Sequence, residues 1–193
     1  MKSRINKCIA SSIESHTRVL KDDSLQENIE MIVKKSVVAF KDDKKMLFCG
    51  NGGSASDAQH IAAELSGRFY SDRPPLYAEA LHVNSSFMTA VANDYSYDET
   101  YSRMLEACGR KGDILVGIST SGNSLNVVNA LEKANEIGLT TVGFTGSKGG
   151  KMNDICDIMI KVPSDDTPRI QEAHILVGHI ICQLIEEEMF PNA

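Results

Sequence analysis

The chain has 193 residues, of which 42% are hydrophobic and 24% charged, and its formal net charge is −6. These values are typical of a soluble globular protein with one sizeable core, and the negative charge argues against a non-specific nucleic-acid binder. Five scattered cysteines without a C-x-x-C pair indicate reduced thiols in a cytoplasmic protein, and no stretch approaches the roughly 18 apolar residues of a membrane helix.

Two amphipathic helices are expected before the first strand. The first is indicated by apolar residues at helical spacing, namely Ile5, Ile9, Ile13 and Leu20. Ser24-x-x-Glu27 resembles a capping box that opens the second helix, which has an apolar side formed by Ile29, Ile32, Val33, Val37 and Phe40. Helices outside an α/β core often bury such a side against another subunit. We therefore expect a homo-oligomer.

The rest of the chain alternates short apolar runs with helical patterns. Strands are predicted at 46–49, 77–83, 113–118, 140–144 and 155–162. Helices are predicted from Ser54 or Ser56 onward and at 85–92, 99–107, 125–137 and 169–189. Such alternation predicts an α/β fold, an open parallel sheet with helices on both faces, and a single domain over residues 1–193.

A glycine-rich loop follows the first predicted strand in the segment CGNGGSASDAQHIAAEL. Glycines let a backbone approach a ligand closely, and the helix start behind the loop favours an anion. The segment matches neither the dinucleotide nor the P-loop pattern, so nucleotide hydrolysis is not expected. On the same helix His60 and Glu64 are spaced i, i+4 and share one face, which suits a metal site or an acid–base pair as well as a plain surface pair.

A second polar loop, STSGNS, follows the predicted strand at 113–118. In open α/β sheets ligands bind at the carboxyl ends of the strands, so both loops are expected at one edge. Hydroxyls together with helix N–H groups can hold a phosphate without a lysine. The alternative is a solvated turn in which Ser124 only caps the next helix; four hydroxyl residues favour phosphate.

The last helix carries Gln171, His174 and His179 in the segment RIQEAHILVGHI. His174 is three residues and His179 eight residues after Gln171, so either imidazole can share a side of the helix with it. Spacing alone does not choose between them, and each could also be an ordinary polar residue of a helix.

These motifs together, with the Asn93-Asp94 pair, resemble the sugar-isomerase (SIS) family over nearly the whole chain. The resemblance implies a flavodoxin-like fold, a homotetramer, and isomerisation of sedoheptulose 7-phosphate to D-glycero-D-manno-heptose 7-phosphate. That reaction would supply heptose for the lipopolysaccharide core or another surface polysaccharide.

The resemblance also implies roles for individual residues. Glu64 would be the catalytic base and His179 its acid–base partner, with zinc as cofactor. The phosphate would be held by Ser119, Thr120, Ser121 and Ser124, and the sugar would be lined by Asn51, Gly52, Gly53, Asn93, Asp94, Gln171 and Glu64. The zinc ligands would be His60, Glu64, Gln171 and His179. Some family members carry an acidic residue where this chain has Pro168, so we assign that position no catalytic role.

Three other interpretations have some support in the sequence. One SIS-family relative binds the replication initiator DnaA and lacks the groups matching Glu64 and His179, which this chain keeps. A sugar-phosphate-sensing regulator would usually carry a DNA-binding unit, for which 193 residues leave no room. Isomerisation of another ketose phosphate would use the same residues and a pocket of different length.

Overall fold

Five parallel strands form one sheet in the part of the chain that the structure, a computed structural model, describes, which is residues 1–192. The strand order is β2-β1-β3-β4-β5, which is the flavodoxin-like order and confirms the predicted fold class. The strands are β1 (Met46–Gly50), β2 (Ala78–Ala80), β3 (Ile114–Ile118), β4 (Thr140–Thr145) and β5 (Ile158–Lys161). The order reverses between β1 and β3, where Gly50 pairs with Ile118, so both polar loops leave the sheet side by side.

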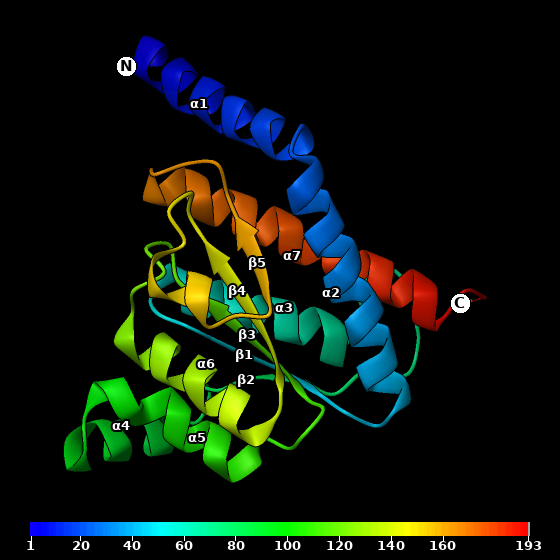
Figure 1. The fold of residues 1–193 in the computed structure, drawn as a ribbon. Coiled ribbons are helices and arrows are strands. Elements are labelled where there is room, and N and C mark those ends of the chain that lie inside the picture. Colours follow the sequence, from blue (N-terminus) through cyan, green and yellow to red (C-terminus); the bar gives the residue numbers. More distant parts are fainter. Residues whose placement is uncertain (193) are drawn as a thin grey trace.

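Helices cover both faces of the sheet (Figure 1). One face carries α2 (Asp23–Lys41), α3 (Gly53–Ser66) and α7 (Thr167–Met189), and the other carries α5 (Thr100–Cys108) and α6 (Leu125–Ile137). The remaining helices are α1 (Lys2–Leu20), α4 (Ser85–Asp94) and the short 3-10 helices η1 (Tyr97–Glu99) and η2 (Gly150–Asp154).

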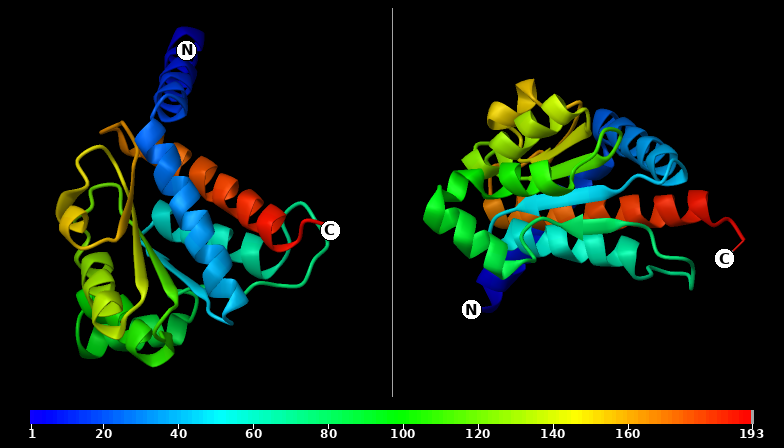
Figure 2. Two further views of the ribbon diagram at one scale, coloured as in Figure 1. Left: turned by 45° about the vertical axis from the view of Figure 1, so that its right-hand side comes forward. Right: turned by 90° about the horizontal axis from the view of Figure 1, so that it is seen from below.

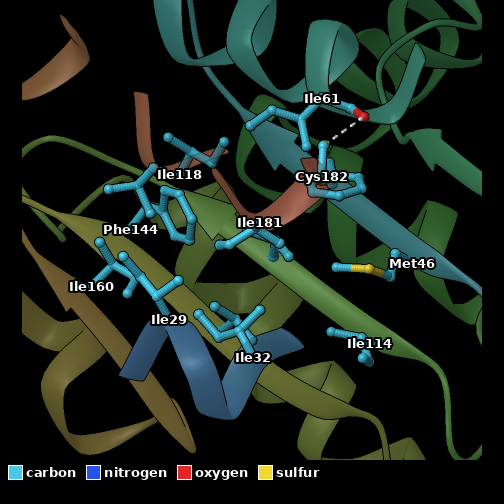
Figure 3. Packing of buried hydrophobic residues seen from close by; sticks show 14 of the residues in the cluster. Ile29, Ile32, Met46, Ile61, Ile114, Ile118, Phe144, Ile160, Ile181 and Cys182 are labelled. Atoms are coloured by element: carbon cyan, nitrogen blue, oxygen red, sulfur yellow. Dashed lines mark hydrogen bonds between the residues drawn. The ribbon is translucent and has the colours of Figure 1, made fainter. Parts of the chain in front are cut away.

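The two faces bury separate apolar clusters. Alternate residues of each strand point to opposite faces, so Met46 and Phe48 pack beneath α2, α3 and α7, whereas Leu47 and Cys49 pack beneath α5 and α6. Figure 3 shows the first cluster, in which the Sγ of Cys182 on α7 lies 3.9 Å from the backbone oxygen of Ile61 on α3. This cluster holds α7 against α3, next to the carboxyl ends of the strands from which the two polar loops leave.

The amino end of helix α1 projects from the rest of the chain, as the left view of Figure 2 shows, whereas its later part contacts α7, where Ser12 donates to Glu172 at 2.7 Å. Its predicted apolar stripe is uncovered: Ile5, Ile9 and Ile13 are 51%, 55% and 62% exposed. By contrast, the apolar side of α2 is buried against the sheet and α7. The prediction of two apolar faces available to another subunit therefore holds for α1 only.

Several predicted boundaries were wrong. Helix α2 is capped by Asp22, whose carboxylate accepts from the N–H of Leu25 at 3.0 Å, and not by the predicted Ser24 capping box. Asp22 comes two residues earlier and is an equally good cap, so the helix begins there. The strands predicted at 77–83 and 155–162 shorten to β2 and β5, and α7 begins at Thr167 because proline is compatible with a first helical turn. No helix within residues 1–192 is long and apolar enough to cross a membrane.

Candidate functional site

The loop after β1 brings the amino end of α3 close to α7. Gly52 has a φ of 57°, a conformation that favours glycine, and α3 begins at the next residue. A Cβ on Gly53 would lie 2.6 Å from the side-chain nitrogen of Gln171, so the amide of Gln171 rests directly on this loop. Gly53 and Gln171 are thus neighbours, and Gly52 lies beside Gly53 in the same loop.

Asn51 in the same loop is tied to its surroundings. Its side chain exchanges hydrogen bonds of 2.8 and 2.9 Å with that of Asn126, and its oxygen also accepts from the Tyr97 hydroxyl at 3.0 Å. The Tyr101 hydroxyl donates to the backbone oxygen of Gly50 and, at 3.3 Å, to the side-chain oxygen of Asn51. Sequence reasoning found Asn51 but missed these three partners, because each comes from a distant part of the chain.

The hydroxyl loop after β3 folds on itself. Ser119 is buried, with its Oγ 3.0 Å from the Oγ of Ser124 and 3.5 Å from that of Ser121. Ser124 occupies the N-cap position of α6, but its side chain makes no capping hydrogen bond. The interpretation of Ser124 as a cap alone is therefore wrong, and its hydroxyl faces the other serines.

A pocket of about 260 Å³ opens beside this loop. It is lined by Thr120, Ser121, Asn123, Gly146, Ser147, Lys148, Asp165, Thr167 and Ile170. Lys148 and Asp165 face each other with 3.7 Å between Nζ and Oδ2, and a hydrogen bond from Ser147 is the main cause that lowers the pKa of Asp165. A phosphate can be held by hydroxyls and helix N–H groups alone, and here Lys148 adds a positive charge to the lining of the pocket.

The imidazole and carboxylate groups of α3 and α7 meet in one cluster. Nε2 of His60 lies 2.9 Å from Oε1 of Glu64 and 3.4 Å from Nε2 of His179, and one ligand atom from each residue lies within 4.8 Å of the other two. The His60 and His179 rings meet edge to face, with 4.9 Å between their centroids. Phe69 flanks His179 at 5.7 Å between ring centroids.

This cluster fits a divalent metal by its chemistry. Two imidazole nitrogens and a carboxylate oxygen that converge from two helices are typical zinc ligands. Two Nε2 atoms at 3.4 Å cannot both point a proton at each other, so the arrangement also suits a shared proton or a cation between them. Gln171 lies on the same helix as His179, two turns earlier, and its amide is the fourth predicted ligand.

Asp57, one turn before His60 on α3, was missed. Burial raises its pKa to about 6, and the charge of His60 offsets part of this rise; one of its carboxylate oxygens is buried without a hydrogen-bond partner. The i, i+3 spacing from Asp57 to His60 was visible in the sequence, but nothing there showed that the carboxylate is half-buried.

His174 and His179 have different environments. His174 is fully buried, its Nε2 lies 3.1 Å from the backbone oxygen of Thr145, and burial lowers its pKa to about 4. It is a neutral core residue that holds the end of β4. His179 is the imidazole that reaches the cluster with Glu64.

Asn93 and Asp94 are not brought to the other groups by contacts within residues 1–192. They are exposed at the end of α4 and hydrogen bond to each other at 2.9 Å. Figure 1 shows α4 on the side of the sheet opposite to α7.

The chain is similar to proteins of one known family. The SIS domain family model matches residues 9–146. The chain belongs to the SIS family. It is 53% identical to the phosphoheptose isomerase of Clostridium acetobutylicum over 190 residues, which cover 98% of this chain and 97% of that protein. It is 50% identical to the phosphoheptose isomerase of Aneurinibacillus thermoaerophilus over 192 residues, covering 100% of this chain and 97% of that protein.

Solved structures agree with this assignment. The phosphoheptose isomerase of Neisseria gonorrhoeae superposes with a TM-score of 0.90 at 40% identity, covering 96% of this chain and 98% of that one. That of Francisella tularensis gives a TM-score of 0.92 at 34% identity, covering 96% and 97%. The open parallel sheet and the two preceding helices are thus those of this family.

Proposed function

We propose that this SIS-family chain is an aldose–ketose isomerase that converts sedoheptulose 7-phosphate into D-glycero-D-manno-heptose 7-phosphate. The observation that carries the proposal is the meeting of Glu64 and His179 in one cluster on α3 and α7. Relatives named phosphoheptose isomerase, about half identical over almost the whole chain, support the same substrate. The comparisons lend no support to the DnaA-binding alternative.

The reaction moves one hydrogen between neighbouring carbons. A base removes a proton from C1 of the ketose to form an enediolate, and the same proton or one from water is returned to C2, while a proton shifts from the oxygen on C1 to that on C2. We assign the carbon proton to Glu64 and the oxygen proton to His179. A carboxylate has two oxygens, so Oε1 can face His60, as in this structure, while Oε2 takes the proton.

Binding of the phosphate falls to the hydroxyl loop. Ser119, Thr120, Ser121 and Ser124 supply donors beside the amino end of α6, where the helix dipole favours negative charge. Asn51, Gly52, Gly53 and Gln171, together with Asn93 and Asp94, would contact the sugar. Since α4 lies away from the cluster within one chain, we propose that Asn93 and Asp94 contribute across a subunit contact.

We also propose that zinc is held by His60, Glu64, Gln171 and His179, which fit it by donor type. When bound, zinc supplies Lewis-acid polarisation of the substrate oxygens. Elemental analysis of the purified protein should find about one zinc per chain, and a chelator should reduce turnover. A metal-free protein with chelator-insensitive turnover would remove zinc from the proposal.

The assembly is proposed to be a homotetramer. Its support is the uncovered apolar stripe of α1, because exposed apolar side chains of this kind gain from burial against another chain. The stripe continues toward an apolar groove of about 360 Å³ that includes Leu20, Ile29, Ile180 and Leu184. Light scattering should give four chains, and Ile9→Lys combined with Ile13→Lys should lower that number.

We further propose a single domain over residues 1–193, of which residue 193 lies outside the described part. Helix α7 lies beyond the 9–146 range of the family model, yet it packs on α2 and α3 and carries Gln171 and His179. A cytoplasmic location is proposed from the five free cysteines among the described residues and the phosphorylated substrate. The product would enter surface-heptose synthesis.

The central test follows conversion of sedoheptulose 7-phosphate to the aldose by NMR in deuterated water, where deuterium at C2 reports the share of the returned proton that comes from water. Glu64→Gln should reduce turnover by roughly 100-fold or more while the fold is retained. Glu132→Gln, an exposed change of the same kind on α6, is the control and should have no effect. Near-native turnover by Glu64→Gln would assign the base to another residue.

A further inference from the structure

Arg73 caps the carboxyl end of α3. Its Nη2 donates to the backbone oxygen of Glu64 at 2.9 Å, and its Nη1 donates to that of Leu65 at 2.8 Å and, more weakly, to that of Gly67 at 3.3 Å. The last carbonyl groups of a helix have no partner within it, and a cation there also complements the helix dipole. The last turn of α3, which carries the proposed base, is therefore closed by a side chain that follows it in sequence.

Glu186, on α7, accepts hydrogen bonds from the segment that connects α3 to Arg73. Its Oε1 accepts from the N–H groups of Tyr70 and Ser71 at 2.8 and 2.9 Å, and its Oε2 accepts from the N–H of Phe69 at 3.2 Å and from Nε of Arg73 at 2.9 Å. The carboxylate is thus bonded by three successive backbone groups and one guanidinium. It also fixes Phe69, whose ring lies beside the ring of His179.

Both charges are out of solvent, with side chains 0% and 4% exposed. Burial alone would raise the pKa of Glu186, but the hydrogen bonds from Ser71, Arg73, Phe69 and Tyr70 outweigh it and hold that pKa below its usual value. A buried pair of this kind is a poor source of net stability, because apolar side chains of equal size often stabilise a core as well. Its geometry, however, joins the carbonyl of Glu64 to the helix that carries His179.

We propose that Arg73 and Glu186 are positioning residues of the isomerase site, which hold Glu64 and Phe69 in register with His179. This inference rests on the proposed function, since it assigns Glu64 and His179 to proton transfer. Arg73 fixes the last turn of α3 through its bonds to the backbone oxygens of that turn. Glu186, on α7, binds Arg73 and the N–H of Phe69, whose ring lies beside His179. Neither side chain touches the substrate.

The chain offers a matched control. Lys45 and Asp113 form another buried ion pair, with side chains 12% and 1% exposed and 2.6 Å between Nζ and Oδ2. Asp113 likewise accepts backbone N–H groups, from Lys45 at 3.1 Å and Arg110 at 2.8 Å. It directly precedes β3, at the amino ends of the strands, whereas the site lies at their carboxyl ends. Asp113→Asn therefore makes the same chemical change as Glu186→Gln in a similar setting, away from the catalytic groups.

The experiment compares wild type, Glu186→Gln, Arg73→Lys and Asp113→Asn at a temperature where all four are folded. Three quantities are measured: kcat and KM for sedoheptulose 7-phosphate, Zn²⁺ affinity of the metal-free protein in competition with a chromophoric chelator, and hydrogen exchange of peptide 67–76. Glu186→Gln should lower kcat and Zn²⁺ affinity at least about tenfold, with KM changed less than about threefold, because a displacement of about 1 Å in a catalytic group can cost about 100-fold in rate and the same groups hold the metal. Exchange in peptide 67–76 should also accelerate.

Asp113→Asn should lose thermal stability without these changes. Arg73→Lys keeps the charge but cannot span Glu186 and three carbonyl groups, so it should resemble Glu186→Gln and replaces it if that variant does not fold. Equal kcat and Zn²⁺ affinity in Glu186→Gln and Asp113→Asn would reduce the pair to a structural role and overturn the proposal. Absence of turnover in the wild type would instead refute the proposed function, and Zn²⁺ affinity would then decide on the pair by itself.

Discussion

The contact between α3 and α7 is so close that a single methyl group should disturb the site. A Cβ on Gly178 would lie 2.5 Å from Cδ1 and 2.8 Å from Cγ1 of Ile61. Gly178 precedes His179, and Ile61 follows His60. The Nε2 atoms of His60 and His179 are 3.4 Å apart. The glycine is therefore what lets the two imidazoles meet.

Gly178→Ala has two opposing effects on stability. Alanine is favoured over glycine in a helix by about 1 kcal/mol, whereas overpacking a core costs about 1–3 kcal/mol. The added Cβ needs roughly 1 Å more room to reach ordinary contact distance, and the Ile61 side chain can yield part of it. We expect a net loss of about 0–2 kcal/mol, which for a chain of this size lowers Tm by a few degrees.

Activity should respond more strongly than stability. A displacement of α7 by even part of 1 Å changes how His179 faces Glu64, and misplacement on this scale can cost about 100-fold in rate. Gly178→Ala should therefore reduce kcat about 10- to 100-fold in the NMR assay with sedoheptulose 7-phosphate, with KM little changed because the hydroxyl loop is not touched.

Ile61→Val tests the cause. The substitution removes Cδ1, costs about 0.5–1.5 kcal/mol alone, and makes room for the new methyl group. Added to Gly178→Ala, it should restore part of the lost kcat although the double variant is no more stable. The reasoning is refuted by full kcat in Gly178→Ala, or by a double variant whose kcat is no higher than that of the single one.

Three further predictions concern other parts of the fold. Ser124→Ala should raise KM about tenfold or more with kcat nearly unchanged, since a hydrogen bond to a charged group contributes about 1.5–3 kcal/mol; an unchanged KM would place the phosphate elsewhere. His174 has a pKa of about 4, below its ordinary value because of burial, so its contribution to stability is complete above pH 6.5 and is lost as pH falls from 6.5 to 4. That loss is about 3 kcal/mol, and the difference in denaturant stability between wild type and His174→Asn should shrink over this range; a constant difference would contradict the neutral buried state. Asp22→Ala should cost about 1 kcal/mol of stability through the lost cap of α2 and leave kcat unchanged, and a helix signal that melts at the same denaturant concentration would contradict this.

The order of strands and helices could be predicted because it depends on local periodicity. The buried run at Ile114–Ile118 and the apolar side of α6 gave nearly correct bounds. Short elements were predicted less well: β2 has only three residues, and its apolar neighbours belong to the turns around it. The two polar loops were placed at one edge by the rule for parallel sheets, and the register of β1 with β3 confirms this.

Contacts between residues far apart in sequence could not be predicted. Spacing on α7 allowed either His174 or His179 into the site, and the choice depends on the carbonyl of Thr145, 29 residues from His174. Glu186 and Arg73 are 113 residues apart, and the sequence shows them only as one acidic residue near the end of a helix and one basic residue before two prolines. Such partners are set by how the helices pack on the sheet, which no local pattern records.

The packing also separates the two tasks of the site. The hydroxyl loop is fixed by backbone pairing, because the N–H of Ser119 bonds to the oxygen of Phe144 on the neighbouring strand. The acid–base cluster is fixed by side chains between two helices, through Gly178 and the Arg73–Glu186 pair. Changes at the strand ends should therefore affect KM, and changes between the helices should affect kcat. Gln171 lies on the helix that carries His179 and packs against Gly53 after β1, so a substitution of Gln171 should alter both constants together.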